Sequence, residues 1–268
     1  MRVSLTSTCQ RVAHRGGAAL APENTLAAFR HVRTLPVDAL ELDVQISRDG
    51  HLIVFHDETV ERLTGGQGNI LDLNLAALRE LDVAAHFAGG WPEPQRMPSL
   101  PEVLELASEN HLQVYIEMKP SKRDGVYGRY PGIAQAVIRD VLAADMLEQV
   151  LIMSFDWTLL PEIKALAPTA TTGALVSEDV WQPRAPSALT ELVAHVKASQ
   201  CSWVNLDYEL FTPDLPDFFH THGLHLGIWT VNDAAGMRRL AATGVDSLTS
   251  DRPDLFACLA DTEESTGS

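Results

Sequence analysis

The chain has 268 residues, of which 46% are hydrophobic, and its net charge at pH 7 is −16. This length suits one large α/β domain or two small ones, and it allows a sizeable core. The strong negative charge argues against nucleic acid as a partner, because it would repel a phosphate backbone. An anionic small-molecule substrate would need local positive charge from arginine, lysine or a metal ion.

The three cysteines, Cys9, Cys201 and Cys258, are far apart and odd in number. This pattern predicts reduced thiols rather than a disulfide framework or a zinc site. The first ten residues contain no apolar run of signal-peptide length, and no stretch reaches the roughly 18 apolar residues of a membrane helix. We therefore expect a cytoplasmic protein without stable membrane insertion.

Apolar runs that suit β-strands alternate along the chain with amphipathic stretches that suit helices. The candidate strands are 11–14, 39–44, 113–118, 149–154, 171–176, 202–207, 224–230 and 246–250. The candidate helices between them include 100–107, 133–144, 159–166, 189–196 and 234–242. Such alternation is typical of parallel sheets, and eight strands over this length predict an α/β fold of the (β/α)8 TIM-barrel type.

One strand-like segment, 52–56, does not fit the alternation. Only residues 47–50 separate it from the strand at 39–44, which is too short a link for a parallel crossover. Asp49-Gly50 is a hairpin turn signal, so we expect an antiparallel arm over the barrel mouth. By strand alternation Leu52, Val54 and His56 should share one face.

Residues 57–98 contain a Gly-rich turn, one short helix at about 75–82 and several prolines. They are too long for a plain loop, and we interpret them as an inserted lid or substrate subdomain at the catalytic face. A decorative loop is the alternative. The predicted barrel domain then comprises 1–56 and 99–260, and the acidic, Ser/Thr/Gly-rich residues 261–268 form a flexible tail.

The first candidate strand ends in a base, a fixed cation and two glycines, at His14-Arg15-Gly16-Gly17. Asn24 or Thr25 can then cap a helix that begins near Leu26. His14 and Arg15 are therefore expected at the C-terminal end of a strand, where α/β barrels place their chemistry.

Carboxylates at alternate positions occur on two further strands. Glu41 and Asp43 should project together from one strand, and Glu117 and Lys119 from another. Taken alone, the first pair could be solvated surface acids and the second a buried ion pair. Together, three carboxylates without a nearby cysteine suit Mg²⁺ or Ca²⁺ rather than Zn²⁺.

Two other residues are candidates on weaker grounds. His56 follows the antiparallel arm beside Asp57, although a lone histidine at a strand end is more often structural. Trp229 lies at the C-terminal end of a strand, where it can wall a small substrate or belong to the ordinary core. We interpret Ser250 to Pro253 as mainly structural, closing the last strand and capping the final helix.

An ordered set of short motifs resembles the glycerophosphodiester phosphodiesterase family. In chain order these motifs are His14-Arg15-Gly16, Pro22-Glu23-Asn24-Thr25, Glu41-Leu42-Asp43, Asp49-Gly50, His56-Asp57, Met97-Pro98-Ser99-Leu100, Glu117-Met118-Lys119, Ser154-Phe155, Trp229-Thr230-Val231-Asn232, Gly244-Val245-Asp246 and Ser250-Asp251-Arg252-Pro253. Each motif is weak alone, but the ordered set is specific and extends from residue 12 to about residue 256.

The resemblance implies metal-dependent hydrolysis of glycerophosphodiesters, such as glycerophosphocholine or glycerophosphoethanolamine, to glycerol 3-phosphate and an alcohol. It implies the following roles: His14 and His56 as paired general acid and base, Arg15 and Lys119 as phosphate-binding cations, Trp229 as an apolar wall near the glycerol, and Glu41, Asp43 and Glu117 as ligands of one divalent cation, Mg²⁺ or Ca²⁺. The expected partner is a small phosphodiester.

Three other functions remain open from the sequence. A phospholipase D-like or cyclic-phosphate-forming lyase would act on a lysophospholipid or sphingomyelin in a similar barrel. A sugar isomerase or enolising barrel also uses inward carboxylates and lysine, but His14-Arg15 beside glycines favours an oxyanion such as phosphate. A catalytically inactive binding protein would be expected to lack a histidine or a metal ligand, and none is missing.

Overall fold

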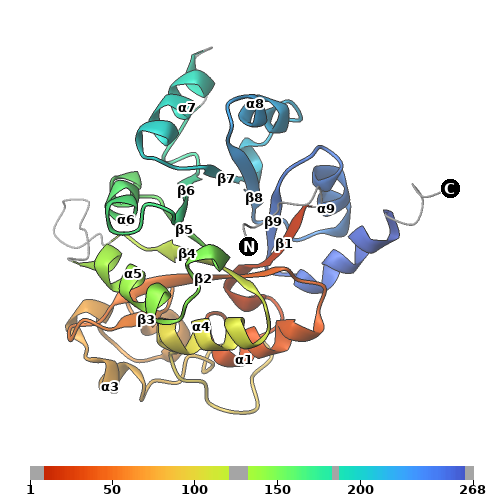
Figure 1. The fold of residues 1–268 in the computed structure, drawn as a ribbon. Helices are drawn as coiled ribbons and strands as arrows, with labels where there is room; N and C mark the ends of the chain where they lie inside the picture. Colours follow the sequence, from red (N-terminus) through yellow and green to blue (C-terminus); the bar gives the residue numbers. More distant parts are fainter. Residues whose placement is uncertain (1–8, 121–131, 183–186, 263–268) are drawn as a thin grey trace.

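A computed structural model of the chain describes residues 9–120, 132–182 and 187–262. Nine strands form one sheet in the order β1-β9-β8-β7-β6-β5-β4-β2-β3, and a further pairing of β1 with β2 closes it into a barrel (Figure 1). Their bounds are β1 Gln10–Ala13, β2 Ala39–Ile46, β3 Leu52–Val54, β4 Gln113–Met118, β5 Val150–Ser154, β6 Thr171–Val176, β7 Trp203–Asp207, β8 His225–Trp229 and β9 Ser247–Ser250. Eight of these strands run parallel, which confirms the predicted α/β barrel.

Helices surround the barrel on the outside (Figure 1). The longer ones are α1 Leu26–His31, α4 Leu100–Glu109, α5 Ile133–Ala143, α6 Leu160–Leu166, α7 Ala188–Ala198, α8 Leu215–Thr221 and α9 Ala234–Ala241. Their starts follow from local chemistry. Thr25 caps α1 by accepting a hydrogen bond from Ala28 N, and Ser99 and Glu102 form a capping box at α4.

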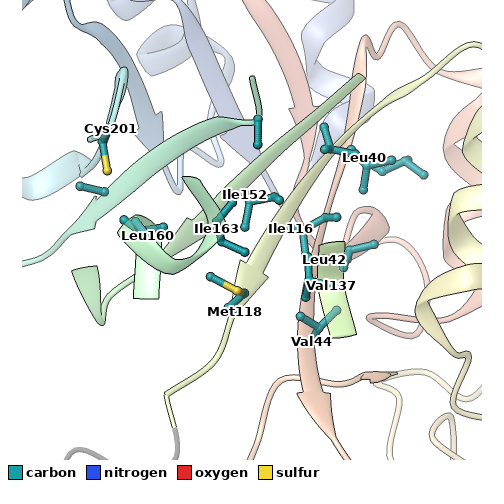
Figure 2. Close-up of a cluster of buried hydrophobic side chains, with 14 of the residues drawn as sticks. Leu40, Leu42, Val44, Ile116, Met118, Val137, Ile152, Leu160, Ile163 and Cys201 are labelled. Atoms are coloured by element: carbon teal, nitrogen blue, oxygen red, sulfur yellow. The ribbon is translucent and has the colours of Figure 1, made fainter. Parts of the chain in front are cut away.

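Strand alternation divides the core into two layers. The outward residues of the strands, such as Leu42 of β2 and Ile116 of β4, pack against helix residues such as Val137 of α5 (Figure 2). The inward residues form a smaller cluster inside the barrel that includes Tyr115 and Trp203. Inward positions nearer the strand ends are therefore the ones available for chemistry.

Strand β3 runs antiparallel to β2, with Val54 opposite Val44 and Leu52 opposite Ile46. Leu52 and Val54 join the main core, but β3 ends at Val54 and His56 lines a cavity instead. The expectation that His56 shares their face is therefore wrong, because the strand period does not continue past the end of the strand.

The segment 57–98 contains the short helices α2 Glu61–Thr64 and α3 Leu75–Leu78. The expected helix at 75–82 is thus limited to one turn. The segment packs on a hydrophobic cluster that is separate from the main core. The buried members of this cluster are Ile53, Phe55, Val60, Ile70, Leu78, Val83 and Met97.

The N-terminal ends of the strands carry paired charges. Arg11 donates from Nε and Nη2 to the carboxylate of Asp38, at 2.9 and 2.8 Å. Asp246 lies between His220 Nε2 and His225 Nδ1, at 2.8 and 3.0 Å, and also accepts from Leu226 N at 2.7 Å. These contacts tie neighbouring strands and helix α8 together at this end of the barrel.

All three cysteines are free, as predicted. Within the described ranges, no helix combines the length and the apolar character needed to cross a membrane. Of the tail predicted at 261–268, residues 263–268 lie outside the described ranges.

Candidate active site

Strand β1 leads into a tight turn that carries His14 and Arg15. Arg15, Gly16 and Gly17 all have positive φ, at 50°, 78° and 85°. A Cβ on Gly16 would lie 2.9 Å from Ala28 Cβ, so glycine allows this turn to pack directly on helix α1. The turn places both side chains at the C-terminal end of the barrel, as predicted from the sequence.

The three predicted carboxylates converge beside this turn. One carboxylate oxygen from each of Glu41, Asp43 and Glu117 lies within 4.8 Å of the others, and all three residues are buried. Asp43 on β2 stands opposite Glu117 on β4 in the parallel register. Lys119 Nζ lies 2.7 Å from Glu117 Oε1 and 3.4 Å from Asp43 Oδ1, so a cation sits at the edge of the group.

The ionisation of the carboxylates reflects this crowding. Burial, followed by the negative charge of Asp43, raises the pKa of Glu41 to about 7. Burial would also raise the pKa of Asp43, but Lys119 and Arg15 outweigh it and hold that pKa well below its usual range. The chain thus stabilises the charge of Asp43 and leaves that of Glu41 poorly compensated.

The donor set of this group fits a hard divalent cation. Asp43 Oδ1 and Glu117 Oε1 are buried, and neither accepts a hydrogen bond of good geometry from the described residues. All three side chains offer oxygen, the ligand type that suits Mg²⁺ and Ca²⁺. Such a cation would satisfy the free lone pairs and offset the repulsion between the carboxylates, so the buried group could hold a metal ion.

Arg15 connects to the same group. Its backbone N donates to Glu41 Oε2 at 2.9 Å, and its Nε lies 3.3 Å from Asp43 Oδ2. Asn24 Nδ2 donates to that same Asp43 oxygen at 2.8 Å. Thr25 is therefore the helix cap, and Asn24 instead orients a predicted metal ligand.

His14 has a carboxylate partner directly after the last barrel strand, β9. Asp251 Oδ1 lies 2.6 Å from His14 Nδ1, and Glu41 Oε2 lies 3.9 Å from His14 Nε2. Burial lowers the pKa of His14, but the negative charge of Glu41 and the hydrogen bond with Asp251 outweigh it and raise the pKa. The interpretation of Asp251 as mainly structural was incomplete, because its 237-residue separation from His14 hides the contact in sequence.

His56 has the equivalent arrangement within its own segment. Asp57 Oδ1 lies 2.6 Å from His56 Nδ1. Arg62 of helix α2 donates from Nε to Asp57 Oδ2 at 2.5 Å and from Nη2 to Glu23 Oε1 at 2.7 Å. Glu23 in turn accepts from Arg15 Nη1 at 3.0 Å. A continuous chain of charge-assisted hydrogen bonds thus connects His56 to Arg15.

Sequence reasoning did not identify Glu23 or Arg62 as site residues. Glu23 belongs to the motif Pro22-Glu23-Asn24-Thr25, and its place in that motif was a usable signal. Arg62 carries no such signal, because only the folded segment brings it against two carboxylates.

These groups open into a cavity of about 280 Å³ at the C-terminal end of the barrel. The described residues that line it are His14, Arg15, Glu41, His56, Glu117, Lys119, Met153, Phe155, Leu175, Asn205, Trp229, Thr230 and Thr249. Seven of the eight predicted site residues are among them, and the eighth, Asp43, is fully buried between Arg15 and Lys119.

The cavity has a charged side and an apolar side. Trp229 and Phe155 meet edge to face, with ring centroids 5.7 Å apart, opposite the cations and carboxylates. A second cavity, of about 390 Å³, lies beside Arg30, Arg33 and Leu112. Its described lining contains no histidine or carboxylate, so the chemistry favours the barrel mouth.

The chain is similar in sequence to known proteins. The model of the glycerophosphoryl diester phosphodiesterase family matches residues 14–255. A glycerophosphodiester phosphodiesterase of Caldanaerobacter subterraneus subsp. tengcongensis is 34% identical over 91% of this chain and 94% of its own length. One from Bacillus subtilis is 32% identical over 91% of this chain and 84% of its own length.

Solved structures agree in fold. The crystal structure of a glycerophosphodiester phosphodiesterase from Agrobacterium tumefaciens is 29% identical, with a TM-score of 0.73 over 93% of this chain and 99% of that one. An Oleispira antarctica phosphodiesterase, solved with its product sn-glycerol-3-phosphate, is 26% identical, with a TM-score of 0.77 over 94% and 97% of the two chains. The chain therefore belongs to the glycerophosphodiester phosphodiesterase family, whose members are phosphoric diester hydrolases.

Proposed function

We propose that this enzyme hydrolyses small glycerophosphodiesters to glycerol 3-phosphate and an alcohol, using His14 and His56 as its acid–base pair. The main support is that two histidines, each with its own carboxylate at 2.6 Å, open into one cavity beside two cations. The product complex of the Oleispira antarctica relative supports glycerol 3-phosphate as the product.

Each histidine is oriented for proton transfer. Because Asp251 and Asp57 contact Nδ1, we assign the Nδ1 proton to those hydrogen bonds and leave Nε2 of each ring free to exchange a proton. One histidine takes the proton of the nucleophile while the other donates a proton to the leaving alkoxide. The nucleophile is either water itself or the neighbouring glycerol hydroxyl, whose attack gives a cyclic phosphate that water then opens to glycerol 3-phosphate. Histidine suits both tasks because its ordinary pKa is about 6.5.

Arg15 and Lys119 bind and orient the phosphate. Both are held by buried carboxylates, which raises the pKa of each despite the opposing effect of burial and keeps both positively charged. We assign Glu41, Asp43 and Glu117 as ligands of one divalent cation, Mg²⁺ or Ca²⁺, which would supply further positive charge against the phosphoryl oxygens. This concentrates positive charge in a protein whose net charge is −16.

We further propose that residues 57–98 form a substrate subdomain. Two observations support this role: the segment has its own buried cluster, and Arg62 contacts the partners of both His56 and Arg15. Trp229 would form the apolar wall beside the glycerol carbons.

The test is a panel of glycerophosphodiesters assayed with Mg²⁺, with Ca²⁺ and with a chelator, followed by product identification. We expect glycerol 3-phosphate as the final product, loss of activity in chelator and recovery on adding Mg²⁺ or Ca²⁺. Full activity in chelator would contradict the metal assignment. A persistent cyclic phosphate would identify the chain as a lyase instead.

A further inference from the structure

The cavity lining includes one buried amide that has no assigned role. Asn205 on β7 points inward among the lining residues and is only 4% exposed. Its Nδ2 makes no hydrogen bond to any described residue. A buried amide without a partner is unfavourable, so it signals either a local cost or a ligand that supplies the missing contact.

The neighbouring strands make room for this amide. A Cβ on Gly173 of β6 would lie 2.7 Å from Asn205 Nδ2, and a Cβ on Gly227 of β8 would lie 2.6 Å from Asn205 Oδ1. Any larger residue at either position would collide with the side chain. Trp229 Nε1 also donates to the backbone carbonyl oxygen of Asn205 at 2.8 Å, which holds the indole of the apolar wall against strand β7 beside this residue.

The surroundings restrict what can reach the amide. Met153, Phe155 and Leu175 line the same cavity, and Leu175 is the direct cross-strand neighbour of Asn205. Two positions earlier on β7, Trp203 packs against Tyr115 inside the barrel, with ring centroids 6.1 Å apart. The cavity wall beside Asn205 is therefore largely apolar, and Thr230 and Thr249 are the other neutral polar residues of the described lining. Such a wall suits a short carbon chain that carries a hydroxyl group.

A hydroxyl group is the ligand that fits both orientations of the amide. It can accept from Nδ2 or donate to Oδ1, and the two amide atoms are readily exchanged by a side-chain flip. The trimethylammonium group of choline cannot accept a hydrogen bond, so it would leave Nδ2 without a partner.

We propose that Asn205 binds the terminal hydroxyl group of the substrate's glycerol moiety and so selects glycerophosphodiesters over diesters that lack this hydroxyl or carry an acyl chain on it. This inference rests on the proposed function. The phosphate lies against Arg15 and Lys119, the glycerol carbons lie along Trp229, and the terminal hydroxyl reaches Asn205. A site built around a hydroxyl group discriminates strongly, because the analogue leaves a buried polar group unpaired.

The test compares two substrates that differ only in that hydroxyl: glycerophosphocholine and 2-hydroxypropyl phosphocholine, which keeps the hydroxyl next to the phosphate ester. For the wild type we expect kcat/KM to fall roughly 10- to 100-fold on the second substrate. For Asn205→Ala we expect a similar loss on glycerophosphocholine and little further loss on the second substrate, because the contact is already gone.

Leu175→Ala is the matched control, since it truncates the cross-strand neighbour in the same cavity. It should lower kcat/KM for both substrates by the same factor. Thermal unfolding of each variant shows whether the fold is retained. If Asn205→Ala does not fold, Asn205→Ser and the wild-type substrate comparison still decide the matter.

The proposal is overturned if the wild type treats the two substrates alike, or if Asn205→Ala, or Asn205→Ser in its place, loses activity equally on both. In either case hydrolysis of glycerophosphocholine by the wild type would leave the proposed function intact. Absence of hydrolysis of any glycerophosphodiester would instead contradict the proposed function itself.

Discussion

The two ends of the barrel use similar residue types for different purposes. At the N-terminal end, Asp246 is held by two histidines and a backbone N–H, and Asp38 by Arg11. At the C-terminal end, three buried carboxylates share the cations Lys119 and Arg15, Asp43 Oδ1 and Glu117 Oε1 accept no hydrogen bond of good geometry from the described residues, and Glu41 has a raised pKa. Charges fully paired within the chain stabilise the fold, whereas a group of buried carboxylates that the chain compensates only in part marks the place for a ligand.

The largest difference between the two ends should appear in catalysis. We expect His14→Ala and His56→Ala each to lower kcat by about 10²- to 10⁴-fold, because each removes a proton donor or acceptor from the reaction. Steady-state kinetics with glycerophosphocholine measures this, and circular dichroism checks the fold. A folded variant with a rate near that of the wild type would remove that histidine from the pair.

Arg62 tests whether the segment 57–98 supports the site. Arg62→Ala should lower kcat roughly 10- to 100-fold, because Asp57 and Glu23 lose the shared guanidinium that positions His56 and Arg15. The pH profile of kcat should also change, since Asp57 contacts His56. Arg62→Lys keeps the charge but loses the bidentate contacts of the guanidinium, so its kcat should lie between those of the wild type and Arg62→Ala. A normal rate and profile in Arg62→Ala would show that this network is only structural.

Asp246 tests the opposite end, where we expect a change in stability and not in activity. Burial raises the pKa of Asp246, but hydrogen bonds from His225 and His220 outweigh it and lower the pKa. The stabilisation is therefore present above the unfolded-state pKa of about 4 and is lost as the pH falls through the folded-state pKa.

Accordingly, Asp246→Asn should lower the free energy of unfolding by about 1–2 kcal/mol at pH 7. Urea unfolding at several pH values should show this difference narrowing below about pH 4. The kcat of the variant should equal that of the wild type. A large loss of kcat would break the division between the two ends.

Much of the fold and of the candidate site could be predicted from local sequence. Period-two alternation placed Glu41 with Asp43 and Glu117 with Lys119, because a strand's geometry fixes the direction of its side chains. The alternation failed at His56, where the strand had already ended. Helix bounds were good where a cap was visible, as at Thr25, and poor at 75–82, where only one turn forms.

The partners of the site residues were harder to predict. Asp251 reaches His14 because closure of the barrel brings β1 beside β9, a contact without a local signal. Arg62 and Asn205 depend in the same way on neighbours that only the fold supplies. Asn205 in particular occupies an ordinary inward strand position, and its unpaired amide becomes apparent only once Gly173 and Gly227 lie on either side of it.

The most direct test of the central claim is thermal unfolding of the wild type, Glu41→Gln and Asp246→Asn, each in chelator and in saturating Mg²⁺ or Ca²⁺. At 100 times the dissociation constant, a bound cation should stabilise the wild type by about 2.7 kcal/mol and Asp246→Asn by the same amount. Glu41→Gln should gain little from the cation, yet in chelator it should melt at or above the wild-type temperature, because it removes a poorly compensated buried charge. Equal stabilisation of Glu41→Gln by the cation, or a marked loss of stability in chelator, would contradict the account.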